Sequence, residues 1–385
     1  MATVADFKQY VETVEKRAGY TRPLAFGLGI RKSKGDKTLE VFFPSINYNK
    51  AFGTAAVLQD VTHFEGNQNG YAVLSKANLQ NAFDKFAAFH NEVEQHPNIT
   101  LIQQLLNNYQ EVEGYQKVEV IAYFLFDKDQ AVENAVEGYF KVQCLSQLHV
   151  QPHGINCSGI FGKMNNIAWT NKGPILPEDI AEERIKATFQ GEELVVSHVD
   201  KFPYLVSFGV PEGVRVVSGS QARLGAHLSP GTTIMPAGYV NFNAGTLGSA
   251  MIEGRVSGGV VVGNQSDVGG GASIMGTLSG GNKNVISIGE KCLLGANAGT
   301  GISLGDGCTV AAGVYITAAS KVSLYNKDKQ PVDLSGKVVA EGKNVVKGME
   351  LNGKSYMLYY NDSQTGKLTA RPNTKLIALN ESLHV

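Results

Sequence analysis

Residues 286–317 read ISIGEKCLLGANAGTGISLGDGCTVAAGVYIT and place an aliphatic residue at nearly every sixth position. Upstream, Val262, Val268 and Ile274 keep the same spacing. Four residues after the aliphatic ones stand small or short side chains: Ser266, Ala272, Cys292, Ala298, Cys308, Val314 and Ser320. A period of six residues with one aliphatic and one small inward position is typical of a parallel β-helix, whose stacked coils bury a continuous column. The pattern predicts such a solenoid over residues 206–322.

The repeat is interrupted twice. Between Ile274 and Ile288 lies the polar, glycine-rich segment 276–284, which predicts a loop that leaves the coil. Between Leu294 and Leu304 four residues are gained. Coils of a solenoid are needed for packing, whereas loops that leave it more often line a site. We therefore expect function near these interruptions, and neutral drift at a corner is the alternative.

The regions before and after the predicted solenoid have different residue patterns. Over residues 1–205, helical periodicity at 6–17 and 77–94 alternates with strand-like runs at 39–43 and 118–126, which predicts an α/β domain. Over residues 323–385, short alternating runs are separated by turn residues at Asn352-Gly353 and Thr365-Gly366. This spacing predicts a small antiparallel β cap. The fold class is therefore mainly β.

Composition excludes several classes of function. Lys plus Arg (34) nearly equals Asp plus Glu (35), so no strong field favours nucleic acid or an anionic membrane. The first twenty residues are charged throughout, which predicts no secretory signal, and no run of eighteen apolar residues predicts a membrane span. The four cysteines lack C-x-x-C spacing, so we expect structural thiols in a reducing cytoplasm.

A more specific pattern lies inside the repeat. Residues 251–255 (MIEGR), followed by residues 266–273 (SDVGGGAS), resemble the tetrahydrodipicolinate N-succinyltransferase family in its longer-chain bacterial form. The likeness is nearly continuous over 224–322, extends weakly to 377–381, and is poor before about residue 200. It implies a left-handed β-helix and a homotrimer with active sites between subunits. It also implies transfer of succinyl from succinyl-CoA, the co-substrate, to the amine of L-2-amino-6-oxopimelate in the diaminopimelate route to lysine.

The resemblance also assigns residues. Glu253 matches the catalytic carboxylate of the family and Arg255 a contact to succinyl-CoA. Further positions that the resemblance places against CoA are Gly270, Ser273, Ala296, Ala311, Ala312, Ala319, Tyr359, Tyr360, Asn361 and Asp362. Two of these depart from the family, since Tyr359 and Tyr360 stand where relatives have arginines. Ser220 and Ala237 match the positions of a metal-binding aspartate and glutamate, so no metal is expected.

The residue types fit acyl transfer. The reaction needs a deprotonated amine, a donor to the developing oxyanion and orientation. Glu253 is the only carboxylate between Glu212 and Asp267. It can act as general base, or as a nucleophile that forms an acyl anhydride, and the sequence leaves both open. The Arg255 fork suits a carboxylate, and glycines 269–271 expose backbone N–H groups. The structural alternatives are an exposed corner position for Glu253, a surface ion pair for Arg255 and tight turns for glycines 269–271.

Other functions are weighed against this one. The alternatives are another CoA-dependent N-acyltransferase with an acetyl donor, and a non-catalytic β-helix scaffold, whose hexads would be uninterrupted. His149, His153 and His227 are candidate bases in hexapeptide acyltransferases generally, but they lie outside the matched motif. Residues 348–355 (GMELNGKS) match a P-loop formally, yet an aromatic strand follows instead of a helix. We therefore do not predict nucleotide hydrolysis.

Overall fold

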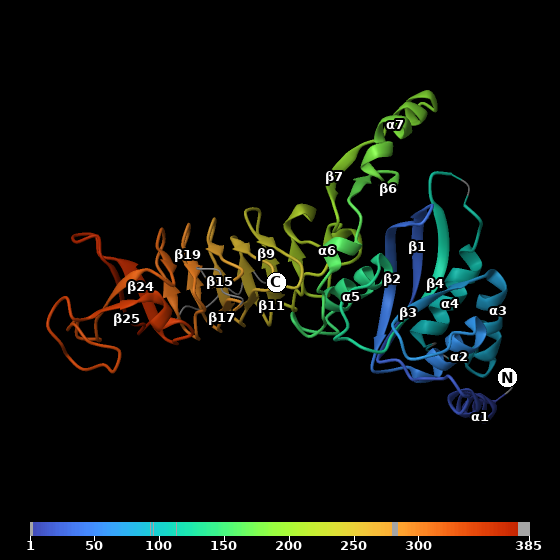
Figure 1. Ribbon diagram of the computed structural model, residues 1–385, viewed down its shortest axis with the longest axis horizontal. Coiled ribbons are helices and arrows are strands. Elements are labelled where there is room, and N and C mark those ends of the chain that lie inside the picture. The colour runs from blue at the N-terminus through green and yellow to red at the C-terminus, as the bar shows by residue number, and fades with distance from the viewer. Residues whose placement is uncertain (1–2, 93, 95, 113, 279–283, 376–385) are drawn as a thin grey trace. The chain divides into compact units, whose positions relative to one another are not determined.

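The chain folds into two units. The computed structural model describes residues 3–92, 94, 96–112, 114–278 and 284–375. One unit comprises residues 1–144 and 155–203, and the other comprises residues 145–154 and 204–385 (Figure 1). None of the helices in the described ranges combines the length and apolarity that a bilayer crossing requires.

The first unit is an α/β domain around an antiparallel sheet. The strand order is β2-β1-β4-β3, with β1 (Ala25–Lys34), β2 (Lys37–Tyr48), β3 (Gly70–Leu74) and β4 (Lys117–Leu125). Its helices are α1 (Val4–Glu15), α2 (Phe52–Thr62), α3 (Lys76–Lys85), α4 (Pro97–Asn108), α5 (Ala135–Ser146) and α6 (Ile160–Lys163). A smaller antiparallel sheet contains β5 (Ile167–Thr170), β6 (Gly173–Ile175) and β7 (Val196–Asp200), with α7 (Ile180–Phe189).

The helix expected over residues 77–94 is shorter than its periodicity predicts. Helix α3 ends at Lys85, and a 3-10 turn follows at Ala87–Phe89. The tighter turn brings both Phe86 and Phe89 against Phe7 of α1, with ring centroids 5.3 and 5.0 Å away. Aromatic packing therefore ends this helix, and the apolar stripe continues in a different geometry.

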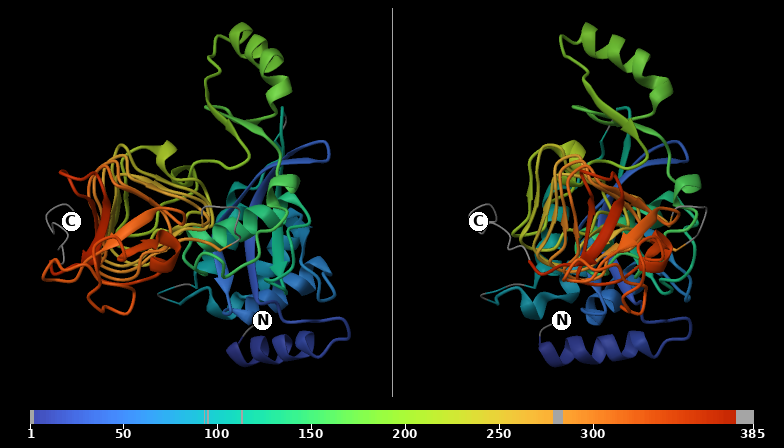
Figure 2. Two further views of the ribbon diagram at one scale, coloured as in Figure 1. Left: turned by 60° about the vertical axis from the view of Figure 1, so that its left-hand side comes forward. Right: turned by 90° about the vertical axis from the view of Figure 1, so that its left-hand side faces the viewer.

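The second unit is the predicted parallel β-helix. Its strands are β8 (Arg215–Val216), β9 (Thr232–Ile234), β10 (Tyr239–Val240), β11 (Gly245–Thr246), β12 (Ala250–Ile252), β13 (Arg255–Val256), β14 (Val261–Val262), β15 (Ser266–Val268), β16 (Ser273–Ile274), β17 (Ser287–Ile288), β18 (Leu293–Leu294), β19 (Gly299–Gly301), β20 (Thr309–Val310), β21 (Tyr315–Thr317) and β22 (Lys321–Leu324). Parallel pairing between coils stacks them into three faces. Figure 1 shows the stack from the side, and the right-hand view of Figure 2 shows the coils overlying one another.

The three faces are named by their strands. The first face contains β8, β9, β12, β15, β18 and β20. The second face is β10-β13-β16-β19-β21, and the third is β11-β14-β17. Each coil therefore visits the faces in this order and turns a corner between them.

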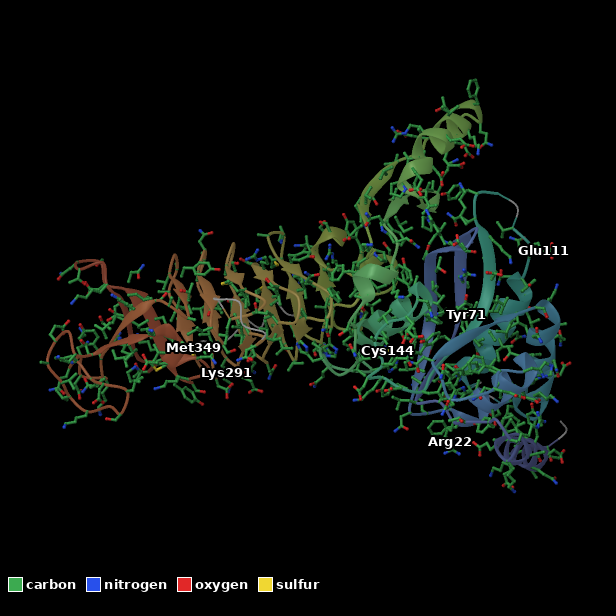
Figure 3. All side chains as sticks on the ribbon, in the orientation of Figure 1. Arg22, Tyr71, Glu111, Cys144, Lys291 and Met349 are labelled. Carbon is green, nitrogen blue, oxygen red and sulfur yellow. The ribbon has the colours of Figure 1, made fainter. Side chains whose placement is uncertain are left out.

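The inward positions are those that the hexads predicted. The aliphatic residues Val262, Val268, Ile274, Ile288, Leu294, Leu304, Val310, Ile316 and Val322 are all buried. The small residues Ser266, Ala272, Cys292, Ala298, Cys308 and Val314 are buried as well, and Ser320 is half-buried. Neighbouring side chains point to opposite sides of the coil wall at these positions. Lys291 is exposed (Figure 3), while the next residue, Cys292, is buried inside the coil.

Lack of space explains the glycines that follow the aliphatic residues. A Cβ on Gly263 would lie 2.5 Å from the backbone carbon of Gly289, and one on Gly295 would lie 2.6 Å from the nitrogen of Ala312. Neither Gly263 nor Gly295 has a positive φ. We expected a small residue or one that tolerates φ > 0 at these corners, and the close approach of the next coil is the reason.

One of the two frame breaks is a shortened corner. Thr300 of β19 is fully buried six residues after Leu294, and Leu304 follows only four residues later. The Thr300 hydroxyl donates to the carbonyl of Ile302 at 2.7 Å, which supports the tight turn. Such corners reduce the coil from eighteen residues to sixteen, as in the pairing of Gly299 with Tyr315. The expectation of inserted residues here was therefore wrong.

The other frame break is a segment that leaves the coil and returns to it. The Leu278 N–H donates to the Asn284 carbonyl at 3.0 Å, and Thr277 forms an antiparallel bridge with Val285. The two ends of the predicted loop over 276–284 therefore lie side by side. Its residues 279–283 lie outside the described residues.

Antiparallel strands close the end of the solenoid. They are β23 (Val345–Lys347), β24 (Met357–Asn361) and β25 (Leu368–Pro372). Strand β24 pairs in parallel with β20 on the first face and antiparallel with β25. This covers an edge that would otherwise invite pairing with another chain. The segment 377–381 lies outside the described residues.

The glycine argument predicts a difference between two alanine substitutions. Gly263→Ala forces a methyl group into the next coil, so we expect a loss of about 1–3 kcal/mol in the free energy of unfolding. Gly258→Ala is the control, because the nearest atom to its Cβ would be 3.7 Å away, and we expect a change within about 0.5 kcal/mol. Chemical denaturation measures both. Equal effects would contradict the spatial explanation.

Candidate active site

Corners between the first and second faces form a continuous backbone ladder. The first corner residue of each coil donates its N–H to the last strand residue of the next coil: Glu253 to Val268 at 2.7 Å, Gly269 to Leu294 at 2.8 Å, Gly295 to Val310 at 2.8 Å and Ala311 to Tyr359 at 2.9 Å. We call the column of Glu253, Gly270, Ala296 and Ala312 the glutamate corner. The structure thus stacks four of the sequence-predicted site residues at one edge.

Glu253 sits in a shortened corner. The inward residues Ile252 and Val256 are only four positions apart, and a Cβ on the intervening Gly254 would lie 2.3 Å from a backbone oxygen. The half-buried Glu253 side chain extends over the next coil, where a Cβ on Gly270 would lie 3.4 Å from its Oε2. A carboxylate is therefore held beside a bare glycine backbone.

Arg255 lies next to this carboxylate on the second face. It is exposed, and its Nη2 donates to Ser273 Oγ at 2.6 Å. The strand register stacks Tyr239, Arg255, Ser273, Gly299 and Tyr315 on this face. Arg255 makes no ion pair with a carboxylate in the described part of the chain, so the surface-ion-pair interpretation has no partner there.

The sequence analysis did not identify Tyr315. Its ring lies on Gly299 of the preceding coil, where a Cβ would be 2.1 Å from a ring carbon, and 46% of the residue is exposed. This places an aromatic ring on the same face as Arg255 and Ser273. Tyr315 stacks on Gly299 because this coil is sixteen residues long, as their pairing shows, and the hexad spacing did not predict that length.

The other predicted residues are distributed differently. Ala311 begins a turn of the glutamate corner, and Ala319 is exposed at the corner that follows β21, on the opposite side of the second face. Tyr360 continues the glutamate corner into β24, and Asn361 beside it is exposed. Tyr359 is fully buried, so its side chain packs in the coil interior and presents no surface to a ligand.

Asp362 is engaged by its own hairpin turn. Its Oδ1 accepts the N–H of Thr365 at 2.8 Å, the N–H of Gln364 at 3.1 Å and the Thr365 hydroxyl at 2.9 Å. These bonds hold the pKa of the Asp362 carboxyl below its ordinary value. The side chain closes the β24–β25 hairpin.

Comparisons with known proteins show the family of this chain. Family models match residues 5–162 (tetrahydrodipicolinate N-succinyltransferase N-terminal), 164–204 (tetrahydrodipicolinate N-succinyltransferase middle) and 285–318 (hexapeptide repeat of succinyl-transferase). A 2,3,4,5-tetrahydropyridine-2,6-dicarboxylate N-succinyltransferase of Vibrio cholerae is 42% identical over 93% of this chain and 98% of its own. The chain belongs to the tetrahydrodipicolinate N-succinyltransferase family.

Further relatives extend the match over the whole chain. The Sulfurovum enzyme of the same name is 37% identical over 100% of this chain and 99% of its own. A crystal structure from Campylobacter jejuni, described as a 2,3,4,5-tetrahydropyridine-2-carboxylate N-succinyltransferase, has a TM-score of 0.87 at 34% identity, over 97% of this chain and 98% of that one. As a member of this family, the chain is an acyltransferase on a left-handed β-helix.

The family likeness also covers the N-terminal domain. We expected it to be poor before about residue 200, and this was wrong, because two family models match within residues 5–204. The hexapeptide repeat is easy to identify by eye, since its period is short. An α/β domain of a succinyltransferase has no comparable period, so its family character is not visible in one sequence.

Two of the candidate histidines, His227 and His153, lie away from the glutamate corner. His227 pairs with Gly245 of the third face, and burial lowers its pKa. His153 contacts the Gly259 carbonyl at 2.7 Å, at the corner between the second and third faces. The formal P-loop begins with a 3-10 turn at Gly348–Leu351 and continues into β24, so it has the strand that we expected and not a P-loop helix.

Ser220 and Ala237, which match the metal-ligand positions of the family, are exposed. Ser220 lies in a 3-10 turn at Gly219–Gln221, and Ala237 lies in the turn before β10. Among the residues that the structure describes, no three His, Cys, Asp or Glu side chains come together as a metal site requires. Neither a hydroxyl nor a methyl group replaces a carboxylate as ligand of a hard cation.

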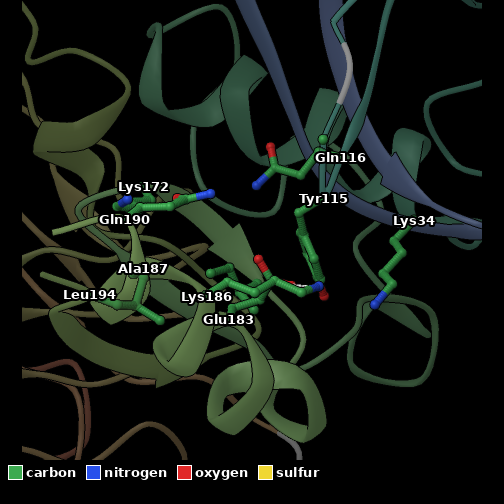
Figure 4. A pocket seen from close by; sticks show the side chains of 11 residues that line it. Lys34, Tyr115, Gln116, Lys172, Glu183, Lys186, Ala187, Gln190 and Leu194 are labelled. Carbon is green, nitrogen blue, oxygen red and sulfur yellow. Dashed lines mark hydrogen bonds and ion pairs between the residues drawn. The ribbon is translucent and has the colours of Figure 1, made fainter. Parts of the chain in front are cut away.

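A pocket in the first unit contains none of the predicted residues. It is lined by Lys34, Gly114, Tyr115, Gln116, Lys172, Ile175, Glu183, Lys186, Ala187, Gln190 and Leu194 (Figure 4). Its lysines are already paired, for example Lys34 with Asp179 and Lys186 with Glu183, both at 2.8 Å. The pocket therefore offers no free positive charge for an acidic substrate.

The contact between Tyr315 and Gly299 can be tested by a double-mutant cycle. Gly299→Ala places a methyl group where the ring lies, so we expect a loss of about 1–3 kcal/mol in unfolding free energy. In a Tyr315→Ala background the same substitution has no ring to displace, so its cost should largely disappear. Urea denaturation of the four proteins gives the coupling. Equal costs in both backgrounds would show that the ring does not lie on Gly299.

Proposed function

We propose that this chain transfers the succinyl group of succinyl-CoA to the amine of L-2-amino-6-oxopimelate, the ring-opened form of tetrahydrodipicolinate. The observation that carries the proposal is the half-buried Glu253 carboxylate beside a glycine backbone, next to the Arg255 guanidinium, which is bonded to Ser273 and makes no ion pair with a described carboxylate. The names of the relatives support the acceptor, because they are 2,3,4,5-tetrahydropyridine-2,6-dicarboxylate N-succinyltransferases. The product belongs to the diaminopimelate route to lysine.

Glu253 supplies the proton chemistry. As a general base its carboxylate accepts a proton from the substrate ammonium, and the free amine then attacks the thioester carbonyl. As a nucleophile it attacks the carbonyl first, forms an acyl anhydride and releases the CoA thiolate, and the amine then attacks the anhydride. In both routes the succinyl carbon gains one bond to nitrogen and loses its bond to sulfur.

Among glycines 269–271, which lie beside Glu253, one backbone N–H can donate to the oxyanion. The N–H of Gly269 donates to Leu294, and that of Gly271 donates to the carbonyl of Glu253. The Gly270 N–H has no acceptor among the described residues. A backbone N–H that is free before substrate binds, beside the catalytic carboxylate, suits the developing charge on the thioester oxygen.

Arg255 selects a donor with a terminal carboxylate. Its guanidinium is fixed by Ser273 on a face without a competing described carboxylate. The fork can bind the free end of a succinyl group in two parallel hydrogen bonds, which an acetyl group cannot use. This distinguishes succinyl-CoA from acetyl-CoA.

We also propose that the active enzyme is a cytoplasmic homotrimer with sites between subunits. The glutamate corner and the second face lie on the outside of the coil, so a neighbouring prism can form the second wall of the CoA groove. The four cysteines are unpaired, as in a reducing compartment.

A substitution of the carboxylate tests the activity. Glu253→Gln removes the proton acceptor or nucleophile with little change in shape, so we expect kcat to fall ~10² to 10⁴-fold while CoA still binds. Turnover of tetrahydrodipicolinate is measured with succinyl-CoA and with acetyl-CoA. Glu290→Gln, at an exposed corner elsewhere on the coil, is the control and should keep wild-type kcat.

Three results would count against the proposal. A Glu253→Gln enzyme with more than a third of wild-type kcat would contradict the role of the carboxylate. Wild-type preference for acetyl-CoA would contradict the donor. No turnover by the wild type with either donor would contradict the reaction itself.

Shared sites predict complementation between defective subunits. Glu253→Ala removes the carboxylate, and Ala296→Trp fills the groove at an exposed corner residue. Each homotrimer should be inactive, and co-refolded mixtures should regain part of the activity, because some interfaces combine the two intact halves. Activity is measured after mixed trimers are verified by mass. Mixed trimers that stay as inactive as the parents would show that each site lies within one chain.

A further inference from the structure

The glutamate corner has a second end, in the cap. Strand β24 continues the first face, with Thr309 paired to Leu358 and Val310 to Tyr359. The Ala311 N–H donates to the Tyr359 carbonyl at 2.9 Å, as the preceding coils do to one another. Tyr360 therefore occupies the position that Glu253 holds at the other end of the column.

Arg371 reaches this end from the neighbouring strand. Its guanidinium carbon lies 5.7 Å from the centroid of the Tyr360 ring. The pair between them, Tyr359 and Ala370, is fully buried. Because side chains alternate across a β ribbon, Tyr360 and Arg371 lie together on the side away from the core.

The charge of Arg371 is not balanced by the described chain. Its Nε is buried without a hydrogen-bond partner, and no described carboxylate forms an ion pair with the guanidinium. Lys367, in the same hairpin, is instead paired with Glu341 at 3.0 Å. A guanidinium keeps its charge in proteins, and a buried N–H without an acceptor is costly. Such a group is suited to an anionic ligand.

The surface between the two ends carries no charge. The corner positions between them are the half-buried Gly270 and the exposed Ala296 and Ala312, so a flexible uncharged chain can lie against the backbone. Four steps of one coil spacing separate Glu253 from Tyr360, which amounts to roughly 19 Å. An extended pantetheine arm spans a comparable length between a thioester and a nucleotide.

We propose that Arg371, held over the Tyr360 ring, binds a phosphate of the nucleotide end of succinyl-CoA. The fork of an arginine matches phosphate oxygens in two parallel hydrogen bonds, and the aromatic ring orients the cation. The inference rests on the proposed function, since it takes the thioester to react at Glu253. It adds a binding residue at the far end of the same corner.

Calorimetry with CoA separates this role from a structural one. Arg371→Gln should weaken CoA binding about tenfold, because one charge-assisted pair is lost. It should raise KM for succinyl-CoA by a similar factor and leave kcat nearly unchanged, whereas Glu253→Gln does the opposite. Lys367→Gln is the matched control, because that cation is already paired, and its CoA affinity should be that of the wild type.

Two CoA analogues identify the phosphate. If Arg371→Gln weakens CoA but not 3′-dephospho-CoA, the guanidinium binds the 3′-phosphate, and equal weakening assigns it to the diphosphate. Binding of S-succinylpantetheine, which has neither, should not change. Either assignment supports the proposal, as does a CoA affinity of the wild type that falls with salt more steeply than that of the variant.

The outcomes that overturn the proposal differ from those that overturn the function. A folded Arg371→Gln protein with wild-type affinity for CoA would remove this inference and leave the reaction intact. A wild type that binds no CoA would remove both. Should Arg371→Gln fail to fold, Arg371→Lys keeps the charge without the fork, and wild-type affinity and salt dependence in that variant would contradict the bidentate contact.

Discussion

Backbone hydrogen bonds between adjacent coils set the constraint on which this β-helix depends. They hold neighbouring coils so close that a Cβ after the inward aliphatic residue has no room at Gly263 or Gly295. The same bonds run along the glutamate corner from Glu253 to Tyr359. Because backbone determines the spacing, the positions of the corner side chains follow from their place in the coil. Precise placement of Glu253 therefore needs no flexible loop.

This constraint also explains why the chemistry lies at so few residues. Inward positions are filled by packing, and some of the positions that follow them, such as Gly263 and Gly295, are restricted to glycine by lack of space. Only the outer positions of the faces and the ends of the corner can carry functional groups. Arg255 and Ser273 use the second face, and Arg371 uses the cap, where β25 pairs antiparallel with β24. The uncharged corner between them is a smooth surface for a ligand.

Much of the fold was predictable because it repeats. The hexads identified most of the inward residues from Val262 to Val322, and the MIEGR motif made Glu253 and Arg255 candidate site residues. What the period concealed was the length of a coil. Most corners separate successive inward residues by six positions and a few by only four, so Thr300 takes an inward place that the hexad pattern did not assign to it. Tyr315 was missed for the same reason.

Residues of the cap were harder to predict, for a different physical reason. The resemblance treated Tyr359 to Asp362 as one binding segment. In a β ribbon neighbouring residues face opposite sides, and Tyr359 is buried while Tyr360 faces outward. Asp362 is taken by the hairpin turn. The cation that lies over the Tyr360 ring, Arg371, comes from the next strand, and pairing between strands is not contained in a local motif.

The cap hairpin has a consequence for how such an enzyme changes over evolution. Since β24 adds to the last coil as another coil would, the hairpin can follow any complete coil without loss of hydrogen bonds. Insertion or deletion of a sixteen-residue coil would move the cap by one strand spacing of about 4.8 Å and leave both ends of the corner intact. On the proposed binding mode, the distance between Glu253 and the cap therefore changes only in whole coils, and no point substitution adjusts it continuously.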